Sequence, residues 1–187
     1  MQLTSSTANL NTRYVDLLKQ IDGVEDALPV IVNVLQGNRG LGFERIEGVD
    51  WEPFARMNGI QLISGRAPEA NDEIVIDATK ARNNNFVVGS ILNLIGNRPY
   101  RVVGIYSPES SARMKMTLRA MQEAFEAPDK CTYIMVKAGN GVDKAVVAKR
   151  ISETLPGNKV QFTEDMFMSV ERSIPYLPVF LRVLVGL

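Results

Sequence analysis

Apolar residues recur along this chain at two different spacings, and the spacings predict where helices and strands lie. Val15, Leu18 and Ile21 follow one another at helical intervals, whereas residues 30–35 read Val-Ile-Val-Asn-Val-Leu and favour a strand. The same reasoning predicts helices over 11–21, 51–57 (begun by Asp50), 78–83 (capped by Asp77), 114–125 and 147–155, and strands over 30–35, 43–49, 73–76, 90–95, 100–106, 131–137 and 159–163.

The order of these elements predicts an α+β fold with two lobes. Helix–strand units stand at both ends of the chain, and a run of short strands punctuated by glycines stands between them. We expect residues 1–37 and 113–170 to form one α/β sandwich lobe, with a β-rich lobe from 38–112 inserted into it. Residues 171–187 are expected to begin a transmembrane segment.

The last segment of the chain is its most hydrophobic. Residues 174–187 carry one charge, at Arg182. As a helix they span roughly 21 Å, which is short of the ~30 Å hydrocarbon core of a bilayer. Two interpretations stay open: the segment packs on the domain, or it is the first part of a membrane span. The N-terminus lacks the basic start and apolar run of a signal peptide.

The composition disfavours some classes of function but does not identify one. The chain has 187 residues, of which 45% are hydrophobic and 22% charged, as in ordinary globular proteins. Its formal net charge is zero, so bulk electrostatics favour neither nucleic acid nor an anionic membrane surface as a partner. It has no histidine, the commonest general base and metal ligand, and its one cysteine, Cys131, cannot form an internal disulfide.

Local motifs that suggest chemistry have plainer explanations. The glycines of 36–42 follow the order G-x-x-G-x-G, not the dinucleotide-binding G-x-G-x-x-G, so a flexible loop is expected there. Glu69, Asp72, Glu73 and Asp77 lie close in sequence but lack the alternation of a calcium loop. Solvated loop charges and a helix cap account for them.

No nucleophile is indicated either. Cys131 has no histidine or second cysteine to activate it, so a buried structural thiol is expected. Serine–lysine catalysis stays open, although no G-x-S-x-G motif supports it. A phosphate-binding P-loop is also missing from the sequence, so any ATPase must be another domain or chain. We predict no catalytic, cofactor-binding or metal-binding residues.

Single glycines mark bends between the short strands. Gly65, Gly89 and Gly104 lie at strand ends or where strands must bend, which predicts positive φ or a bulge. Arg66, beside the first of them, is placed to pair with Asp72 or Glu73.

Several short phrases occur in a fixed order along nearly the whole chain. They are 48–50 (Gly-Val-Asp), 62–66 (Leu-Ile-Ser-Gly-Arg), 73–76 (Glu-Ile-Val-Ile), 88–94 (Val-Gly-Ser-Ile-Leu-Asn-Leu) and 100–105 (Tyr-Arg-Val-Val-Gly-Ile), then a helix with Met121 and Gln122, a strand over 133–137 and a helix over 146–155. In this order, and followed by an apolar end, they resemble the extracytoplasmic core domain of MacB/FtsX/LolC-type ABC transporter permeases. The middle part is more compact than in longer versions of that domain.

The resemblance implies a porter-like α/β lobe with an inserted, Sabre-like lobe, held between the first two transmembrane helices of a bacterial permease. It implies no enzymatic activity and no cofactor in this domain. The implied partners are a cytoplasmic ABC ATPase, a second permease protomer, a periplasmic accessory or substrate protein, and the membrane through flanking helices. The implied location is the inner (cell) membrane, with this domain on the periplasmic or extracellular side.

In that arrangement the helix over 11–21 continues a first membrane span and residues 164–187 lead into the second. Motion driven by the cytoplasmic ATPase would then move the lobe of one protomer against its neighbour. The alternative is a soluble periplasmic or extracellular ligand-binding or sensor module, which needs a concave apolar pocket. Sequence alone decides neither the cargo, nor the accessory partners, nor the oligomeric state of the isolated domain.

Overall fold

The computed structural model describes residues 1–5, 10–36 and 43–161. Its helices are α1 (Tyr14–Lys19), α2 (Trp51–Asn58), α3 (Ala78–Asn84), α4 (Leu118–Ala124) and α5 (Lys144–Thr154), with a 3-10 turn at Ile95–Asn97. Its strands are β1 (Gln2–Ser5), β2 (Leu10–Asn11), β3 (Val24–Gln36), β4 (Phe43–Val49), β5 (Gln61–Gly65), β6 (Glu73–Asp77), β7 (Ile91–Asn93), β8 (Pro99–Ser107), β9 (Met114–Thr117), β10 (Lys130–Cys131), β11 (Tyr133–Ala138) and β12 (Asn158–Gln161). The fold is α+β, as predicted.

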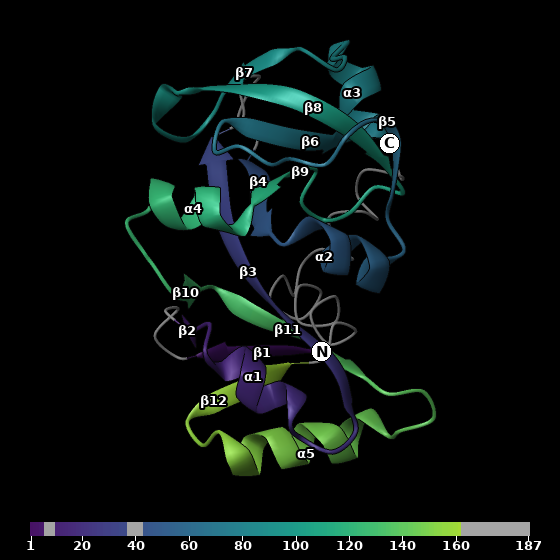
Figure 1. Ribbon diagram of the computed structural model, residues 1–187, viewed down its shortest axis with the longest axis vertical. Helices are drawn as coiled ribbons and strands as arrows, with labels where there is room; N and C mark the ends of the chain where they lie inside the picture. Colours follow the sequence, from purple (N-terminus) through teal and green to yellow (C-terminus); the bar gives the residue numbers. More distant parts are fainter. Residues whose placement is uncertain (6–9, 37–42, 162–187) are drawn as a thin grey trace, which may run out of the picture.

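Ten of the described strands form one long sheet, in the order β12-β1-β11-β3-β4-β9-β6-β8-β5, with β7 beside β8. The long strand β3 joins its two parts, because residues 24–30 pair with β11 and residues 31–36 pair with β4. Figure 1 shows β3 running from one end of the molecule towards the other. We call β1, β11 and β12 with α1 and α5 the lower half, and β4 to β9 with α3 and α4 the upper half.

A threonine side chain marks the point where β3 changes its partner. The Thr132 amide donates to the Val30 carbonyl at 2.8 Å, and the Val32 amide donates to the Thr132 hydroxyl at 3.0 Å. The hydroxyl therefore accepts a bond that a strand carbonyl would otherwise accept. Here the predicted strand over 131–137 is divided: β10 pairs with β2, and β11 pairs with β3.

The sheet is covered on both faces. Val30 and Ile31, which are neighbours on β3, belong to two different groups of buried apolar side chains. On β6, Val75 lies in one group, and Ile74 and Ile76 lie in the other. Since neighbouring residues of a strand point to opposite faces, each face has its own core.

The larger of these cores is shared by the two halves. It contains Leu3 of β1 and Ile151 of α5 from the lower half, and Ile74 of β6 and Met114 of β9 from the upper half. All four side chains are fully buried. The halves therefore share packing as well as the strand β3.

The prediction of a helix over 114–125 is wrong in its first turn. Met114–Thr117 is strand β9, which pairs in parallel with β4, and α4 begins at Leu118 with its N-terminus capped by Thr117. The apolar stripe was misread because a strand covered on both faces can carry buried residues at every position. Met114, Lys115 and Met116 are all completely buried.

The first helix is shorter than predicted and does not begin as expected. Instead of spanning 11–21 it spans Tyr14–Lys19, because Asn11 pairs in β2 and its side chain accepts from the Arg13 amide at 2.9 Å. Strands β1 and β2 precede it, so it does not continue an upstream span. Its Leu18 is fully buried in the core of the domain.

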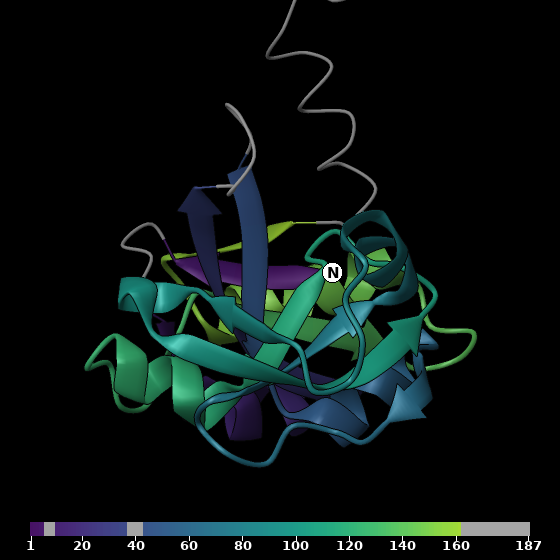
Figure 2. The ribbon, with the colours of Figure 1, turned by 90° about the horizontal axis from the view of Figure 1, so that it is seen from above.

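Other predicted elements are confirmed with small changes at their ends. The strand over 43–49 pairs back against β3, α2 follows it, and β7 and β8 form the predicted antiparallel pair. In Figure 2 the paired ends of β3 and β4 stand out from the body of the molecule. Strand β1 was not predicted. The predicted strand over 159–163 begins at Asn158, and its last two residues lie outside the described ranges.

Within the described ranges, none of the helices is long and apolar enough to cross a membrane. The segment 171–187, expected to begin a transmembrane span, lies outside these ranges, and so does most of the glycine-containing segment 36–42.

Candidate functional site

A buried ion pair lies in the upper half beside its boundary with the lower half. Parallel pairing of β4 with β9 places Glu47 directly beside Lys115. The Lys115 ammonium donates to a Glu47 carboxylate oxygen at 2.8 Å. The Lys115 side chain has no exposed surface and that of Glu47 is 4% exposed. A buried pair of this kind is strongly destabilising to break on one side only, because the remaining charge is then unpaired.

Aromatic side chains and a backbone carbonyl complete the surroundings of this lysine. The ammonium lies 4.9 Å from the ring centre of Phe54 and 5.6 Å from that of Tyr106, at cation–π distance. The ammonium also donates to the Ala112 carbonyl at 3.0 Å. The same carbonyl accepts a second hydrogen bond, from the Tyr106 hydroxyl at 2.9 Å. Burial lowers the pKa of Lys115, and the charge of Glu47 opposes that shift.

The ion pair also reaches the lower half. The Tyr133 hydroxyl of β11 lies 3.5 Å from the other carboxylate oxygen of Glu47. Burial is the main cause that raises the pKa of Tyr133, so its phenol stays protonated at neutral pH. Because Lys115 is inaccessible, this cluster cannot hold a substrate or act as a nucleophile. Its chemical effect is to hold β4, β9 and β11 in one arrangement.

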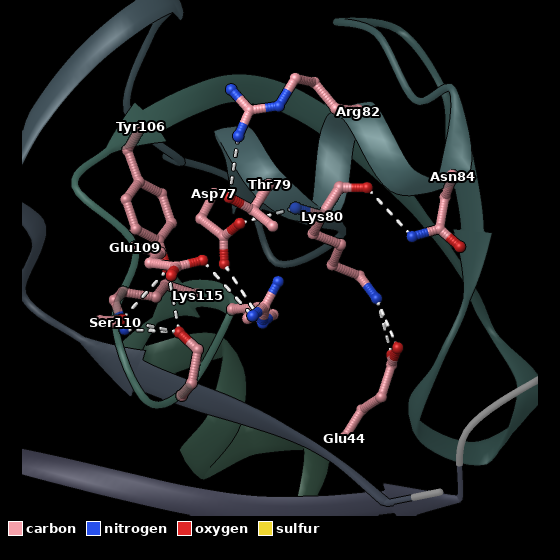
Figure 3. Close-up of polar contacts among 12 residues, drawn as sticks. Glu44, Asp77, Thr79, Lys80, Arg82, Asn84, Tyr106, Glu109, Ser110 and Lys115 are labelled. Atoms are coloured by element: carbon pink, nitrogen blue, oxygen red, sulfur yellow. Dashed lines mark hydrogen bonds and ion pairs between the residues drawn. The ribbon is translucent and has the colours of Figure 1, made fainter.

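A second polar cluster lies between α3 and the start of β4 (Figure 3). The fully buried Asp77 caps α3 by accepting from the Lys80 amide at 2.7 Å, as predicted. Figure 3 shows the Lys80 side chain directed towards Glu44, whose two carboxylate oxygens lie 2.7 and 2.8 Å from the ammonium. The second oxygen of Asp77 has no hydrogen bond and faces the Arg113 guanidinium at 3.9 Å.

Beside this cluster is a hollow of about 350 Å³. Its walls come from the start of β4, from α3 and from the residues that lead into β9, and most of them are polar or charged. Two further hollows, of about 390 and 260 Å³, lie along β11 and beside β3.

The acidic residues near α3 do not gather at one point. Glu73 accepts from the Arg66 guanidinium and from the amides of Glu69 and Ala70. Of the two partners predicted for Arg66, Asp72 and Glu73, it therefore pairs with Glu73. The hydrogen bonds from Arg66 are the largest cause that lowers the pKa of Glu73 to about 2. Across the described part of the chain, no three metal-ligating side chains cluster closely enough to hold an ion.

The cysteine is buried as predicted. Cys131 is 2% exposed, and its thiol lies 3.5 Å from the Leu10 carbonyl. Burial raises the pKa of this thiol to about 12, so the reactive thiolate is not formed at neutral pH.

Sequence reasoning did not find the Glu47–Lys115 pair. A signal was present, since Lys115 stands directly between two methionines, Met114 and Met116. It was overlooked because a lysine on an amphipathic helix is expected to face solvent.

The sequence profile of the MacB-like periplasmic core domain matches residues 2–154. The fold is similar to the extracellular domain of the noncanonic ABC-type transporter YknZ from Gram-positive bacteria, with a TM-score of 0.64 and 15% identity, over 87% of this chain and 99% of that one. It is also similar to the periplasmic region of MacB from Actinobacillus actinomycetemcomitans, with a TM-score of 0.65 and 16% identity, over 91% of each chain. Curated proteins give no significant match.

At these identities the structural likeness concerns the fold alone, whereas the profile covers most of the chain. Members of this family are extracytoplasmic parts of ABC transporter permeases. This chain belongs to the MacB-like periplasmic core domain family.

Proposed function

We propose that this domain transmits motion, driven by a cytoplasmic ABC ATPase, to a substrate or partner protein outside the membrane. In the working transporter it would face a second permease protomer and be tied to the bilayer through flanking helices. Membership of the permease family supports this role. The division into lobes over 1–37 with 113–170 and over 38–112 stays a prediction.

The observation that carries the proposal is the way the two halves are joined. One strand, β3, pairs with β11 in one half and with β4 in the other, and both cores contain side chains from both halves. A displacement applied at one end is absorbed by a flexible linker and passed on by a rigid connection. We infer that the domain moves as one body.

The buried ion pair strengthens that joint. Glu47 contacts Lys115 within the upper half and Tyr133 of the lower half. Phe54 and Tyr133 also pack in the same buried group. If one half slid past the other, these charged groups would lose their partners while still buried. Leaving a buried charge unpaired costs free energy, because the surroundings have a low dielectric constant. The preferred motion is therefore that of a whole domain against its neighbour.

The test is a distance measurement in the complete transporter. Spin labels are placed at Val87 in the upper half and Lys149 on α5, which are 64% and 78% exposed. Pulsed electron paramagnetic resonance is recorded without nucleotide and with bound ATP. We expect the 87–149 distance within one protomer to stay constant and the 149–149 distance between protomers to change.

Diluting labelled with unlabelled protomers isolates the distance within one protomer. The protein with only its native Cys131 serves as the labelling control, because that thiol is 2% exposed. If the distance between the labels at positions 87 and 149 within one protomer changed with nucleotide, rigid transmission would be contradicted. An unchanged distance between protomers would contradict the proposed function itself.

A further inference from the structure

We propose that the hollow between β4, α3 and β9 binds an oxyanion, of the type carried by a phosphate or a carboxylate group. Of the charged residues that line it, Arg45, Lys80 and Arg113 are cationic and Glu44 is anionic. Lys80 is already bound by both oxygens of Glu44. The other two cationic residues of the lining, Arg45 and Arg113, make no such close contact with a carboxylate.

These two arginines have donors to spare. Neither side chain donates a hydrogen bond to any other residue that the structure describes, and their ion contacts are long. Arg45 lies 3.8 Å from Glu47, and Arg113 lies 3.9 Å from Asp77 and 3.4 Å from Glu109. A guanidinium has five N–H donors in a planar fork that fits the two oxygens of a carboxylate or phosphate.

A buried carboxylate lies near each of these arginines. The carboxylates of Glu47 and Asp77 are buried, so they attract the guanidinium groups without filling the hollow themselves. The Asp77 amide further donates to the Arg113 carbonyl at 3.0 Å, which fixes that residue beside α3. Arginines positioned in advance lose less conformational freedom when an anion binds.

Neutral groups and one competing carboxylate define the rest of the site. Ser111 and Asn83 line the hollow and can donate to the same anion. Glu109, which is 55% exposed, is the competitor, because its carboxylate lies 3.4 Å from the Arg113 guanidinium. Removing its charge should therefore strengthen binding. This property is independent of the motion proposed above.

The experiment titrates the 187-residue chain with inorganic phosphate and, separately, with acetate. Amide shifts are followed by nuclear magnetic resonance at neutral pH and constant ionic strength. We expect a saturable shift confined to the residues around the hollow. The anion that binds more tightly then identifies a phosphate-bearing or a carboxylate-bearing natural ligand.

Three variants test the residues that carry the inference, and a fourth serves as the control. Arg113→Gln and Arg45→Gln should each weaken binding by roughly tenfold, because each removes a charge-assisted hydrogen-bond partner. Glu109→Gln should tighten binding a few-fold. The control is Arg56→Gln, which removes the same charge from an exposed position on α2 that does not line the hollow.

The spectra also report whether each variant is folded, and Arg113→Lys provides a second variant that keeps the charge without the planar fork. It should bind more weakly than the native chain and more tightly than Arg113→Gln. The proposal is overturned if neither anion gives a saturable shift. It is equally overturned if Arg56→Gln weakens binding as much as Arg113→Gln does.

Discussion

At the scale of single residues, charged side chains in this domain serve to hold chain segments together. Lys115 and Glu47 are the most buried example, and Lys80 with Glu44 is a second. Arg66 with Glu73 is a third, at the surface of the 66–73 loop. Each pair ties together segments that are distant in sequence or fixes a loop.

The buried pair should show strong coupling between its members. Lys115→Met leaves the Glu47 carboxylate buried without its partner and should lower the free energy of unfolding by about 3–5 kcal/mol. The double variant Lys115→Met/Glu47→Gln should regain much of that loss, because no unpaired charge remains. Urea unfolding of the native chain, both single variants and the double variant measures the coupling. Purely additive losses would contradict an ion pair.

Glu73 should make stability depend on acid pH. Its pKa falls from 4.5 to about 2 in the folded protein, so its contribution is present above pH 4.5 and is lost as the pH falls towards 2. Glu73→Gln should therefore be less stable than the native chain at pH 7, and the difference should shrink between pH 4.5 and 2. Urea unfolding across this range measures it.

The matched control for this effect is Glu69→Gln in the same loop. The Glu69 side chain is 80% exposed and contacts Arg66 only at 3.9 Å. Its replacement should leave the pH dependence nearly unchanged. Equal curves for the two variants would show that the Arg66–Glu73 bonds have no particular part in it.

At the scale of elements, the upper half depends on turns that only certain residues allow. Gly65 ends β5 with φ of 73°, and a Cβ at this position would collide with the Val103 carbonyl of β8. Gly89 has φ of 97° with open space around it, and Gly104 lies where the pairing of β8 with β6 shifts register. The predictions for these three glycines are confirmed.

Two alanine variants separate conformational strain from collision. Gly89→Ala should cost roughly 1–2 kcal/mol, the strain of a left-handed conformation in a residue with a Cβ. Gly65→Ala should cost more, because strand β8 must also move away from the new methyl group. Thermal unfolding followed by circular dichroism compares them. A Gly65→Ala variant as stable as Gly89→Ala would mean that β5, at the sheet edge, gives way easily.

At the scale of the whole molecule, the shared strand and shared cores predict one cooperative unfolding transition. Trp51, the one tryptophan, lies on α2 and packs against the smaller of the two cores. Ile151 lies on α5 in the lower half and belongs to the larger core. Ile151→Ala should cost about 2–5 kcal/mol and should shift the Trp51 fluorescence transition as far as the circular dichroism transition.

The control is Lys149→Ala on the same helix, whose side chain is 78% exposed and which should shift neither signal appreciably. If Ile151→Ala shifts the circular dichroism signal and leaves the tryptophan signal in place, the halves unfold separately. Rigid transmission through β3 would then lose its physical basis.

The sequence by itself determined most local elements of this domain. Alternation and turn residues were enough for the strand over 43–49, the β7–β8 pair and the Asp77 cap, since these depend on neighbours in sequence. The sequence also shows directly that the chain has no histidine and no nucleotide-binding motif. The ordered phrases were sufficient to identify the family, which the profile over 2–154 confirms.

Only the tertiary structure decided which segments meet. Met114–Thr117 is a strand because β4 and β6 lie on either side of it, and local spacing carries no trace of those partners. Glu47 and Lys115 are 68 positions apart, and their register across two parallel strands is what buries them together. The use of β3 by both halves likewise depends on β11 and β4, which periodicity within β3 cannot reveal, because pairing is set by remote chain segments.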